Sequence, residues 1–314
     1  LARMPKNSDF AIIEIGMNSP NEIRPLAKLA ALDVAIVLNV APVHLKAFKN
    51  VEEIAFAKAE IFENLTSKNS AIVNNDLSTT QILLKAVNAV GANLVTFGQK
   101  DKSDFRLVSS TWHKNKTSVK AKINDQNIHF DFCAEGDHFS MNALAAFAAA
   151  ELVGADRKIT TQAFSNWQAP KGRGERKKIK FGLGNIELID ESYNANPISM
   201  AAALKVLSNS KSSGRKIAIL GEMGELGVEE NLFHSDLARI EGIKEIDVFY
   251  LVGPLMRFMW DELPDYKESK WFESIDELIM EIGSLIAVND TIMVKGSNYT
   301  KVSKIVEAIK KVSV

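Results

Sequence analysis

Cysteine is almost absent from this sequence, with Cys133 the single one among 314 residues. One cysteine excludes an internal disulfide framework and suits a reducing compartment, so we expect a cytoplasmic protein. The longest clean apolar stretches, such as residues 143–150, are far shorter than the roughly 18–20 residues of a membrane span. No basic segment followed by an apolar one opens the chain, so a secretory signal is not predicted.

Net charge is also nearly absent. Lys and Arg number 38 and Asp and Glu number 39, which gives a formal charge of -1. Such a balance offers no overall electrostatic reason to bind nucleic acid or an acidic membrane. The most basic stretch, residues 171–180, contains no aromatic side chain, which further disfavours a nucleic-acid interface.

Two phosphate-binding motifs are missing as well. The chain contains no G-x-x-x-x-G-K-[ST] and no G-x-G-x-x-G. Residues 221–227 are rich in glycine and follow an apolar run, but their spacing does not fit a dinucleotide fingerprint. The two glutamates of this segment would repel phosphate, so it is interpreted as a substrate-binding loop.

The pattern of apolar residues predicts two α/β domains, in line with about 150 residues per domain. Short apolar runs such as Phe10–Ile15 and Val34–Val40 alternate with helical spacing, which indicates a mostly parallel sheet. Residues 105–132 alternate without helices and predict a small antiparallel meander. After a linker predicted at Gln168–Lys180, the alternation of strands and helices resumes as a Rossmann-like domain. The expected domains are residues 1–173 and 174–314.

Polar side chains follow the first predicted strands, where a parallel sheet binds its ligands. Glu14 ends one apolar run, which is the arrangement of a magnesium-binding carboxylate, although a solvated strand end has the same pattern. Asn39 and His44 follow the next run and would emerge on the same edge of the sheet, with a structural role as the alternative.

Lys58 lies in the middle of an apolar helical stripe over residues 51–65. Burying an ammonium group costs several kcal/mol unless it is paired. The side chain could instead extend to the surface, but a phosphate partner or a chemical modification explains its position better. An arginine between the domains, Arg173 or Arg176, is a candidate phosphate ligand because its guanidinium matches phosphate oxygens.

Eight segments, taken in their order along the chain, resemble the Mur ligase family from one end of the chain to the other. The resemblance rests on Glu14–Asn18, Asn39–Leu45, Ala57–Phe62, Gly136–Ala145, Lys171–Gly174, Asp190–Pro197, Gly221–Gly227 and Val294–Ser297. The segments 192–197 and 221–227 are similar to those of the family member that uses D-alanyl-D-alanine.

The resemblance implies an ATP-dependent peptide ligase of peptidoglycan precursor synthesis. Such an enzyme joins D-alanyl-D-alanine to UDP-N-acetylmuramoyl-tripeptide through an acyl phosphate, with ATP and Mg²⁺. The resemblance also implies a central ATP-binding domain followed by the Rossmann-like ligase domain. A monomer is expected.

The resemblance also assigns roles to residues. Glu14, His44 and a carbamylated Lys58 would bind Mg²⁺, and Lys58, His44 and Arg173 would be catalytic. ATP would be bound by Asn39, Asn142 at the adenine, Arg173 at the phosphates and Glu191 at the ribose, and the other substrates by Asn194, Asn196, Glu222 and Lys295. Two positions depart from the family pattern: Glu191 replaces the usual Asp, and Asn298 replaces the usual Arg.

Family members also have an N-terminal UDP-binding domain and a P-loop, whereas this chain starts at Leu1. We therefore expect a fragment that cannot turn over ATP by itself. Three alternatives remain open: a Mur ligase for another substrate, a relative of folylpolyglutamate synthetase, or a non-catalytic binding module that has lost its P-loop.

Overall fold

The computed structural model describes residues 4–42 and 47–312. The chain divides into two compact units. The first, here the N-terminal unit, runs to residue 132 and includes 137–166, and the second, the C-terminal unit, comprises 133–136 and the chain from 167 onward. The boundary expected after residue 173 stays a prediction. Neither unit, over its described residues, contains a helix with the length and apolar character needed to cross a membrane.

The N-terminal unit is a mixed sheet covered by helices. Its elements are α1 (Ile23–Ala30), β1 (Val34–Val37), α2 (Val51–Ala59), β2 (Ser70–Asn74), α3 (Thr80–Val90), β3 (Asn93–Gly98), β4 (Phe105–His113), β5 (Lys116–Ile123), β6 (Gln126–Phe132), α4 (Asp137–Leu152) and α5 (Arg157–Ser165). The sheet order is β1-β2-β3-β4-β5-β6. Strands β1 to β4 pair in parallel and β4 to β6 pair antiparallel, which confirms the predicted parallel sheet and meander.

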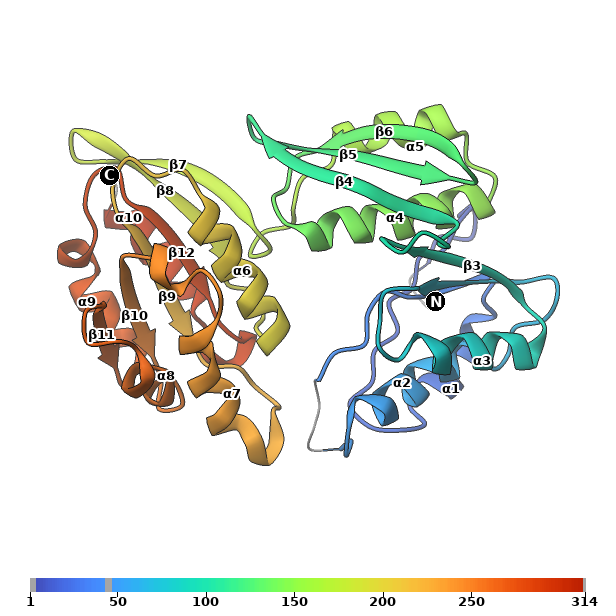
Figure 1. The fold of residues 1–314 in the computed structure, drawn as a ribbon, viewed down its shortest axis with the longest axis horizontal. Coiled ribbons are helices and arrows are strands. Elements are labelled where there is room, and N and C mark those ends of the chain that lie inside the picture. The colour runs from blue at the N-terminus through green and yellow to red at the C-terminus, as the bar shows by residue number, and fades with distance from the viewer. Residues whose placement is uncertain (1–3, 43–46, 313–314) are drawn as a thin grey trace. The chain divides into compact units, whose positions relative to one another are not determined.

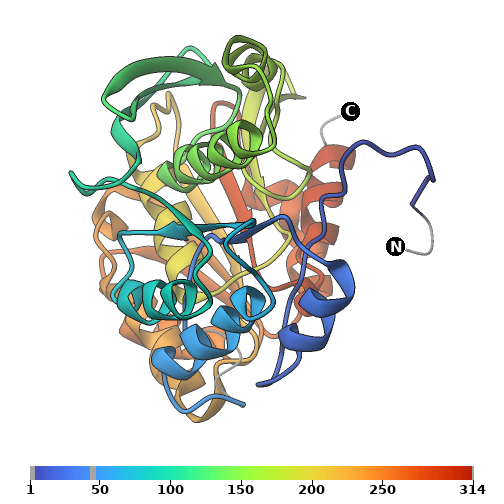
Figure 2. The same ribbon diagram turned by 90° about the vertical axis from the view of Figure 1, so that its right-hand side faces the viewer.

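Helices cover the sheet of this unit on both faces. The side chains of α1, α2 and α3 form one core with β1 and β2, while α4 packs against β2, β3 and β4. Figure 1 shows α4 and α1–α3 on opposite sides of β3. In Figure 2 the green antiparallel strands curve over the light-green helices α4 and α5, where Phe130, Phe147 and Phe164 pack ring against ring.

The predicted strand at Phe10–Ile15 is wrong. These residues belong to no strand, and the side chains of Phe10 and Ile12 are 66% and 101% exposed. A strand forms only where a neighbouring strand satisfies its backbone groups. Within the described residues β1 is the edge of the sheet and pairs only with β2, so Phe10–Ile15 does not pair with the open edge that β1 offers.

The C-terminal unit is Rossmann-like, as predicted. Its elements are β7 (Glu175–Phe181), β8 (Gly184–Glu191), α6 (Pro197–Asn209), β9 (Lys216–Gly221), α7 (Glu230–Asp236), β10 (Val248–Val252), α8 (Met256–Glu262), β11 (Glu268–Phe272), α9 (Ile275–Leu285), β12 (Thr291–Lys295) and α10 (Ser303–Val312). The sheet order is β11-β10-β9-β12-β8-β7, and every pairing is parallel except that of β7 with β8.

The second half of the predicted linker is not a linker, because Glu175–Phe181 forms the edge strand β7. Pro170, Gly172 and Gly174 among charged residues predicted a linker, whereas the lysines of the second half, Lys177, Lys178 and Lys180, are exposed side chains of the strand. Charged side chains are common on edge strands because they discourage pairing with other chains.

The direction of chain progression reverses at one point of this sheet. From β9 the chain moves outward to β10 and β11, and it then returns to place β12 on the other side of β9. Accordingly, α6 and α8 contribute to the core on one face, and α9 and α10 to the core on the other. Ligands of such sheets bind beyond the carboxyl ends of the strands at this switch point, here β9 and β12.

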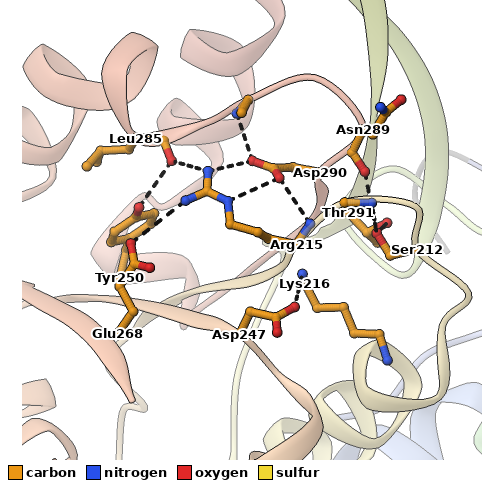
Figure 3. Close-up of polar contacts among 12 residues, drawn as sticks. Ser212, Arg215, Lys216, Asp247, Tyr250, Glu268, Leu285, Asn289, Asp290 and Thr291 are labelled. Carbon is orange, nitrogen blue, oxygen red and sulfur yellow. Dashed lines mark hydrogen bonds and ion pairs between the residues drawn. The ribbon is translucent and has the colours of Figure 1, made fainter. Parts of the chain in front are cut away.

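The opposite, amino end of these strands is held by an ion pair (Figure 3). Asp290, 1% exposed, accepts hydrogen bonds from Nη2 of Arg215 at 2.8 Å and from the N–H of Ala287 at 2.7 Å. Arg215 also donates to the carbonyl of Leu285 at 3.1 Å, as does the hydroxyl of Tyr250. These contacts join the starts of β9 and β12 to the end of α9.

We expect Asp290→Asn to lower the free energy of unfolding by about 2–3 kcal/mol. Removing one partner of a buried pair costs about 3–5 kcal/mol, and the 36% exposure of the Arg215 side chain reduces that penalty. Urea unfolding followed by circular dichroism measures the change. The matched control is Glu268→Gln, since Glu268 lies 3.8 Å from Arg215 on the exposed side and should contribute under about 1 kcal/mol. Equal losses in both variants would contradict the prediction.

Candidate active site

Three predicted site residues of the C-terminal unit lie at neighbouring strand ends. Glu191 ends β8, Lys295 ends β12, and Glu222 directly follows β9. Since β12 lies between β8 and β9, the tertiary structure brings together residues that are far apart in the sequence. This is the switch point at which a sheet of this kind binds ligands.

Lys295 is the most deeply buried charge of this group, with 2% of the residue exposed. Its Nζ lies 3.3 Å from Oε2 of Glu191 and donates to the carbonyl of Asn194 at 3.0 Å. Burial lowers the pKa of Lys295, while the carboxylate of Glu191 opposes that shift. A buried ion pair adds little net stability, and strongly perturbed titratable groups gather at functional sites. The pair is therefore a candidate for binding or catalysis.

Glu222 is held in one orientation from two directions. Its Oε1 accepts the N–H of Leu255 at 2.8 Å, and its Oε2 accepts the hydroxyl of Tyr299 at 2.9 Å. Burial and the nearby carboxylate of Glu222 raise the pKa of Tyr299, so this hydroxyl remains a donor. Gly253 has φ +104°, and a Cβ there would lie 2.7 Å from Glu222. The site therefore presents a fixed carboxylate that retains lone pairs for a ligand.

The loop that follows Glu222 is tied to two elements. The N–H of Gly224 donates to Oγ of Ser297 at 2.8 Å, and the N–H of Met223 donates to Nε2 of His234 at 2.9 Å. Ser297 in turn donates to the carbonyl of Ala195 at 3.1 Å. Sequence reasoning missed Tyr299 and His234, whose roles depend on contacts across 77 and 11 positions of the chain.

Asn196 has a structural task at the start of α6. Its Oδ1 accepts the N–H of Ser199 at 2.8 Å, and Pro197 follows it as the first residue of α6. This is a helix N-cap with a capping box. Asn194 uses its Oδ1 for the N–H of Ala195 at 2.9 Å. Within residues 4–42 and 47–312 no hydrogen bond of either NH₂ group is seen, and the predicted contacts of both amides with substrate stay predictions.

The structure separates the two candidate phosphate ligands by their partners. Arg176 forms ion pairs with Glu135 and Glu187 and donates to Oγ of Ser210 at 2.7 Å. Arg173 is exposed, and its guanidinium lies 4.0 Å from the centroid of the Tyr193 ring. Because the guanidinium of Arg176 is already paired with two carboxylates, Arg173 is the better candidate to bind an anionic ligand.

The predicted residues of the N-terminal unit lie on separate elements. Glu14 is exposed in the segment without secondary structure, Asn39 is exposed after β1, and Asn142 is exposed on α4. His44 lies outside the described residues. Among the described residues no contact joins Glu14, Asn39 and Asn142, and their roles stay predictions.

Lys58 is partly buried on α2, beside the buried residues Ile54, Ala55 and Ala57. Burial lowers its pKa, with no carboxylate opposing the shift. Within the part of the chain that the structure describes, its Nζ has no hydrogen bond or ion pair. Residues 4–42 and 47–312 contain no group of three or more His, Cys, Asp and Glu side chains that could hold a metal ion.

Comparisons with known proteins agree with this division of the chain. The sequence model of the Mur ligase middle domain matches residues 1–150, and that of the Mur ligase glutamate ligase domain matches residues 172–298. A UDP-N-acetylmuramoyl-tripeptide–D-alanyl-D-alanine ligase of Rickettsia prowazekii is 31% identical over 308 residues, which are 98% of this chain and 68% of that protein.

Solved structures show the same fold. A crystal structure of MurF from Acinetobacter baumannii matches 98% of this chain and 66% of its own, with a TM-score of 0.87 and 24% identity. MurF from Thermotoga maritima in complex with ADP matches 94% of this chain and 65% of its own, with a TM-score of 0.80 and 21% identity. The present chain therefore spans about two thirds of the length of these relatives.

Proposed function

This chain belongs to the Mur ligase family, and from that premise we propose that it forms the middle and C-terminal parts of an ATP-dependent ligase. The ligase would join D-alanyl-D-alanine to UDP-N-acetylmuramoyl-tripeptide. The name of the Rickettsia relative supports these substrates. The observation that carries the proposal is the buried Lys295–Glu191 pair beside the fixed Glu222 carboxylate, at the switch point of the sheet.

The reaction has two steps. A substrate carboxylate attacks the γ-phosphorus of ATP, which gives an acyl phosphate and releases ADP. The amine of the dipeptide then attacks the acyl carbon, which forms the amide, releases phosphate and leaves a proton for a base or water. Both steps concentrate negative charge, so fixed cationic groups lower their barriers.

We propose that the charged groups of the C-terminal unit have separate roles in these two steps. Lys295 would face the developing negative charge, held in place by Glu191 and the carbonyl of Asn194. Glu222 would receive the ammonium group of the dipeptide, because a fixed carboxylate is the natural partner of a primary amine. Asn194 and Asn196 would contribute their NH₂ groups. Glu191 is also the proposed ribose ligand, a contact that competes with its bond to Lys295.

ATP would be bound by Asn39, Asn142, Arg173 and Glu191. Arg173 lies with its guanidinium carbon 4.0 Å from the centroid of the Tyr193 ring, and the N–H groups of a guanidinium held against a ring can still bind phosphate oxygens. The bound ADP of the Thermotoga relative supports a nucleotide ligand for this fold.

Mg²⁺ would be held by Glu14, His44 and Lys58, with Lys58 as a carbamate. The chemistry of Lys58 fits this role, since a lowered pKa provides the neutral amine that reacts with CO₂, and the side chain has no described partner to displace. When bound, the ion would neutralise phosphate charge. A carbamate would make Lys58 an oxygen ligand of the type that Mg²⁺ prefers.

The proposed function is tested on the full-length protein that contains these residues. With ATP, Mg²⁺, UDP-N-acetylmuramoyl-tripeptide and D-alanyl-D-alanine, we expect ADP release that needs both other substrates, and a product whose mass is the sum of both minus water. A preference for glutamate or a single amino acid as the amine would favour another Mur ligase or a folylpolyglutamate synthetase. No ADP release with any amine would favour a binding module.

Arg173→Ala is expected to raise KM for ATP about 10-fold, since a charge-assisted contact contributes about 1.5–3 kcal/mol. Arg176→Ala is expected instead to lower the urea midpoint, because it leaves Glu135 and Glu187 unpaired. Steady-state kinetics and urea unfolding measure the two effects, with the exposed Lys178→Ala as the neutral control. A larger change in KM for Arg176→Ala than for Arg173→Ala would reverse the assignment.

A further inference from the structure

His234 is a fully buried histidine whose two ring nitrogens are both used. It lies on α7, and its ring forms a hydrogen bond with the loop at residues 221–227. Nε2 lies 2.9 Å from the backbone nitrogen of Met223, and Nδ1 lies 2.6 Å from the carbonyl oxygen of Glu230. A backbone N–H can only donate and a carbonyl can only accept, so the ring is neutral with its proton on Nδ1.

The bond to Met223 acts on the residue next to Glu222. On the side of β12, the loop is held by the bond from Gly224 to Ser297 and by the N–H of Ser297 on the carbonyl of Glu222 at 2.9 Å. On the side of α7, it is held by His234. The loop includes Glu225 at φ +62° and Gly227 at φ +70°, so regular helical bonds do not fix it. The His234 contact therefore holds the peptide that follows Glu222, while the bonds from Leu255 and Tyr299 hold the carboxylate itself.

We propose that His234 is a positioning residue: its unprotonated Nε2 fixes the Met223 peptide, and with it the carboxylate of Glu222, for recognition of a primary amine. The second half of this statement rests on the proposed ligase function, whereas the tether itself does not. No part of the proposal requires His234 to touch the substrate.

A consequence is that acid loosens the loop. A proton on Nε2 would face the N–H of Met223, so two donors would oppose each other. Burial lowers the pKa of His234, while Glu230 on its own helix and Glu222 on the loop act in the opposite direction. Because the folded-state pKa is depressed, the contribution to stability is complete above the ordinary pKa of about 6.5 and is lost as pH falls through the folded-state value.

Two substitutions separate the hydrogen bond from the bulk of the ring. In His234→Gln, Oε1 can accept the N–H of Met223 but does not titrate, whereas His234→Leu fills space without an acceptor. Hydrogen exchange measured by NMR on the 314-residue chain should show that the Met223 amide of the wild type is protected, and that this protection decreases as the pH is lowered. In His234→Gln the Met223 amide should stay protected without the pH dependence. In His234→Leu its protection factor should fall at least about 10-fold. Asn231→Ala, at an exposed position of the same helix, is the matched control.

In the full-length ligase, His234→Leu should raise KM for D-alanyl-D-alanine about 10-fold with kcat changed less, and Gln should restore KM to within about 3-fold. Equal exchange of the Met223 amide in all variants, or a ¹⁵N spectrum with the ring proton on Nε2, would overturn the tether. A tether that behaves as expected together with unchanged KM would overturn the positioning role alone. Absence of any ligase activity would instead reject the proposed function, and the exchange data would still decide the tether. If the Leu variant does not fold, the Gln variant and the wild-type ring spectrum decide.

Discussion

Replacing Lys295 by methionine is expected to lower the ligation rate at least about 100-fold, equivalent to about 2.7 kcal/mol of transition-state stabilisation. The substitution keeps an unbranched side chain, one atom shorter than lysine, but removes its charge. It also leaves the mostly buried carboxylate of Glu191 without its cation, which lies 3.3 Å away in the wild type. Steady-state kinetics of the full-length enzyme measure the effect, with circular dichroism as a check of folding.

The double variant Glu191→Met with Lys295→Met separates function from stability. Because burial lowers the pKa of Lys295, the folded state disfavours the charged lysine, and this cost is present at neutral pH. Replacing a buried pair by apolar residues is often neutral or stabilising. We therefore expect the double variant to unfold at an equal or higher urea concentration than the wild type while remaining inactive.

A double variant that is active, or a Lys295→Met enzyme with normal turnover, would exclude a catalytic role for this pair. A double variant that is both inactive and strongly destabilised would show that the pair holds the fold together. In that case the loss of activity would say nothing in favour of chemistry at Lys295.

Replacing Lys58 by alanine is expected to reduce turnover at least about 1,000-fold, or about 4 kcal/mol, because a metal ligand would be lost. The wild type should slow when CO₂ is removed and recover with bicarbonate, whereas high bicarbonate should not restore the variant. The lowered pKa of Lys58 leaves more neutral amine at a given pH than an ordinary lysine has, and carbamate formation should increase as pH rises.

A direct readout for Lys58 is the carbamate itself. With ¹³C-labelled bicarbonate, the wild type should show a protein-bound carbamate signal that Lys58→Ala lacks. Lys85→Ala provides the control, since Lys85 is an exposed lysine on the neighbouring helix α3. Full activity of Lys58→Ala, or a carbamate signal that survives it, would refute the proposed metal-ligand role.

Local patterns were sufficient for most of the fold. Apolar runs alternating with helical spacing predicted both parallel sheets, and strict alternation over residues 105–132 predicted the meander. These predictions hold because each depends on which face of one element is apolar, a property written into adjacent residues. The prediction of a strand at Phe10–Ile15 fails because an apolar run does not state whether it pairs with a neighbour, and this one does not pair with the open edge of β1.

The same distinction applies to the candidate site, where some residues could be found from the sequence and others only from the fold. The sequence supplied Glu191, Asn194 and Lys295 through the family resemblance, and Glu222 through that resemblance and through its place in a glycine-rich loop after an apolar run. It did not distinguish Arg173 from Arg176, because only the fold places Glu135 and Glu187 around Arg176. It also contained no sign of Tyr299 or His234, which look like an ordinary loop tyrosine and an ordinary helix histidine.

By itself the sequence set limits on this protein: one cysteine rules out an internal disulfide, a net charge of -1 gives no general attraction to nucleic acid, and its apolar runs are short. The alternation of apolar residues determined its elements. The tertiary structure alone decided which charges are free to act, because pairing across the sheet ends joins Lys295 to Glu191 and fixes Glu222 between Leu255 and Tyr299. The chemistry of a charged side chain depends on its neighbours in the folded structure, and these neighbours are far away in the sequence.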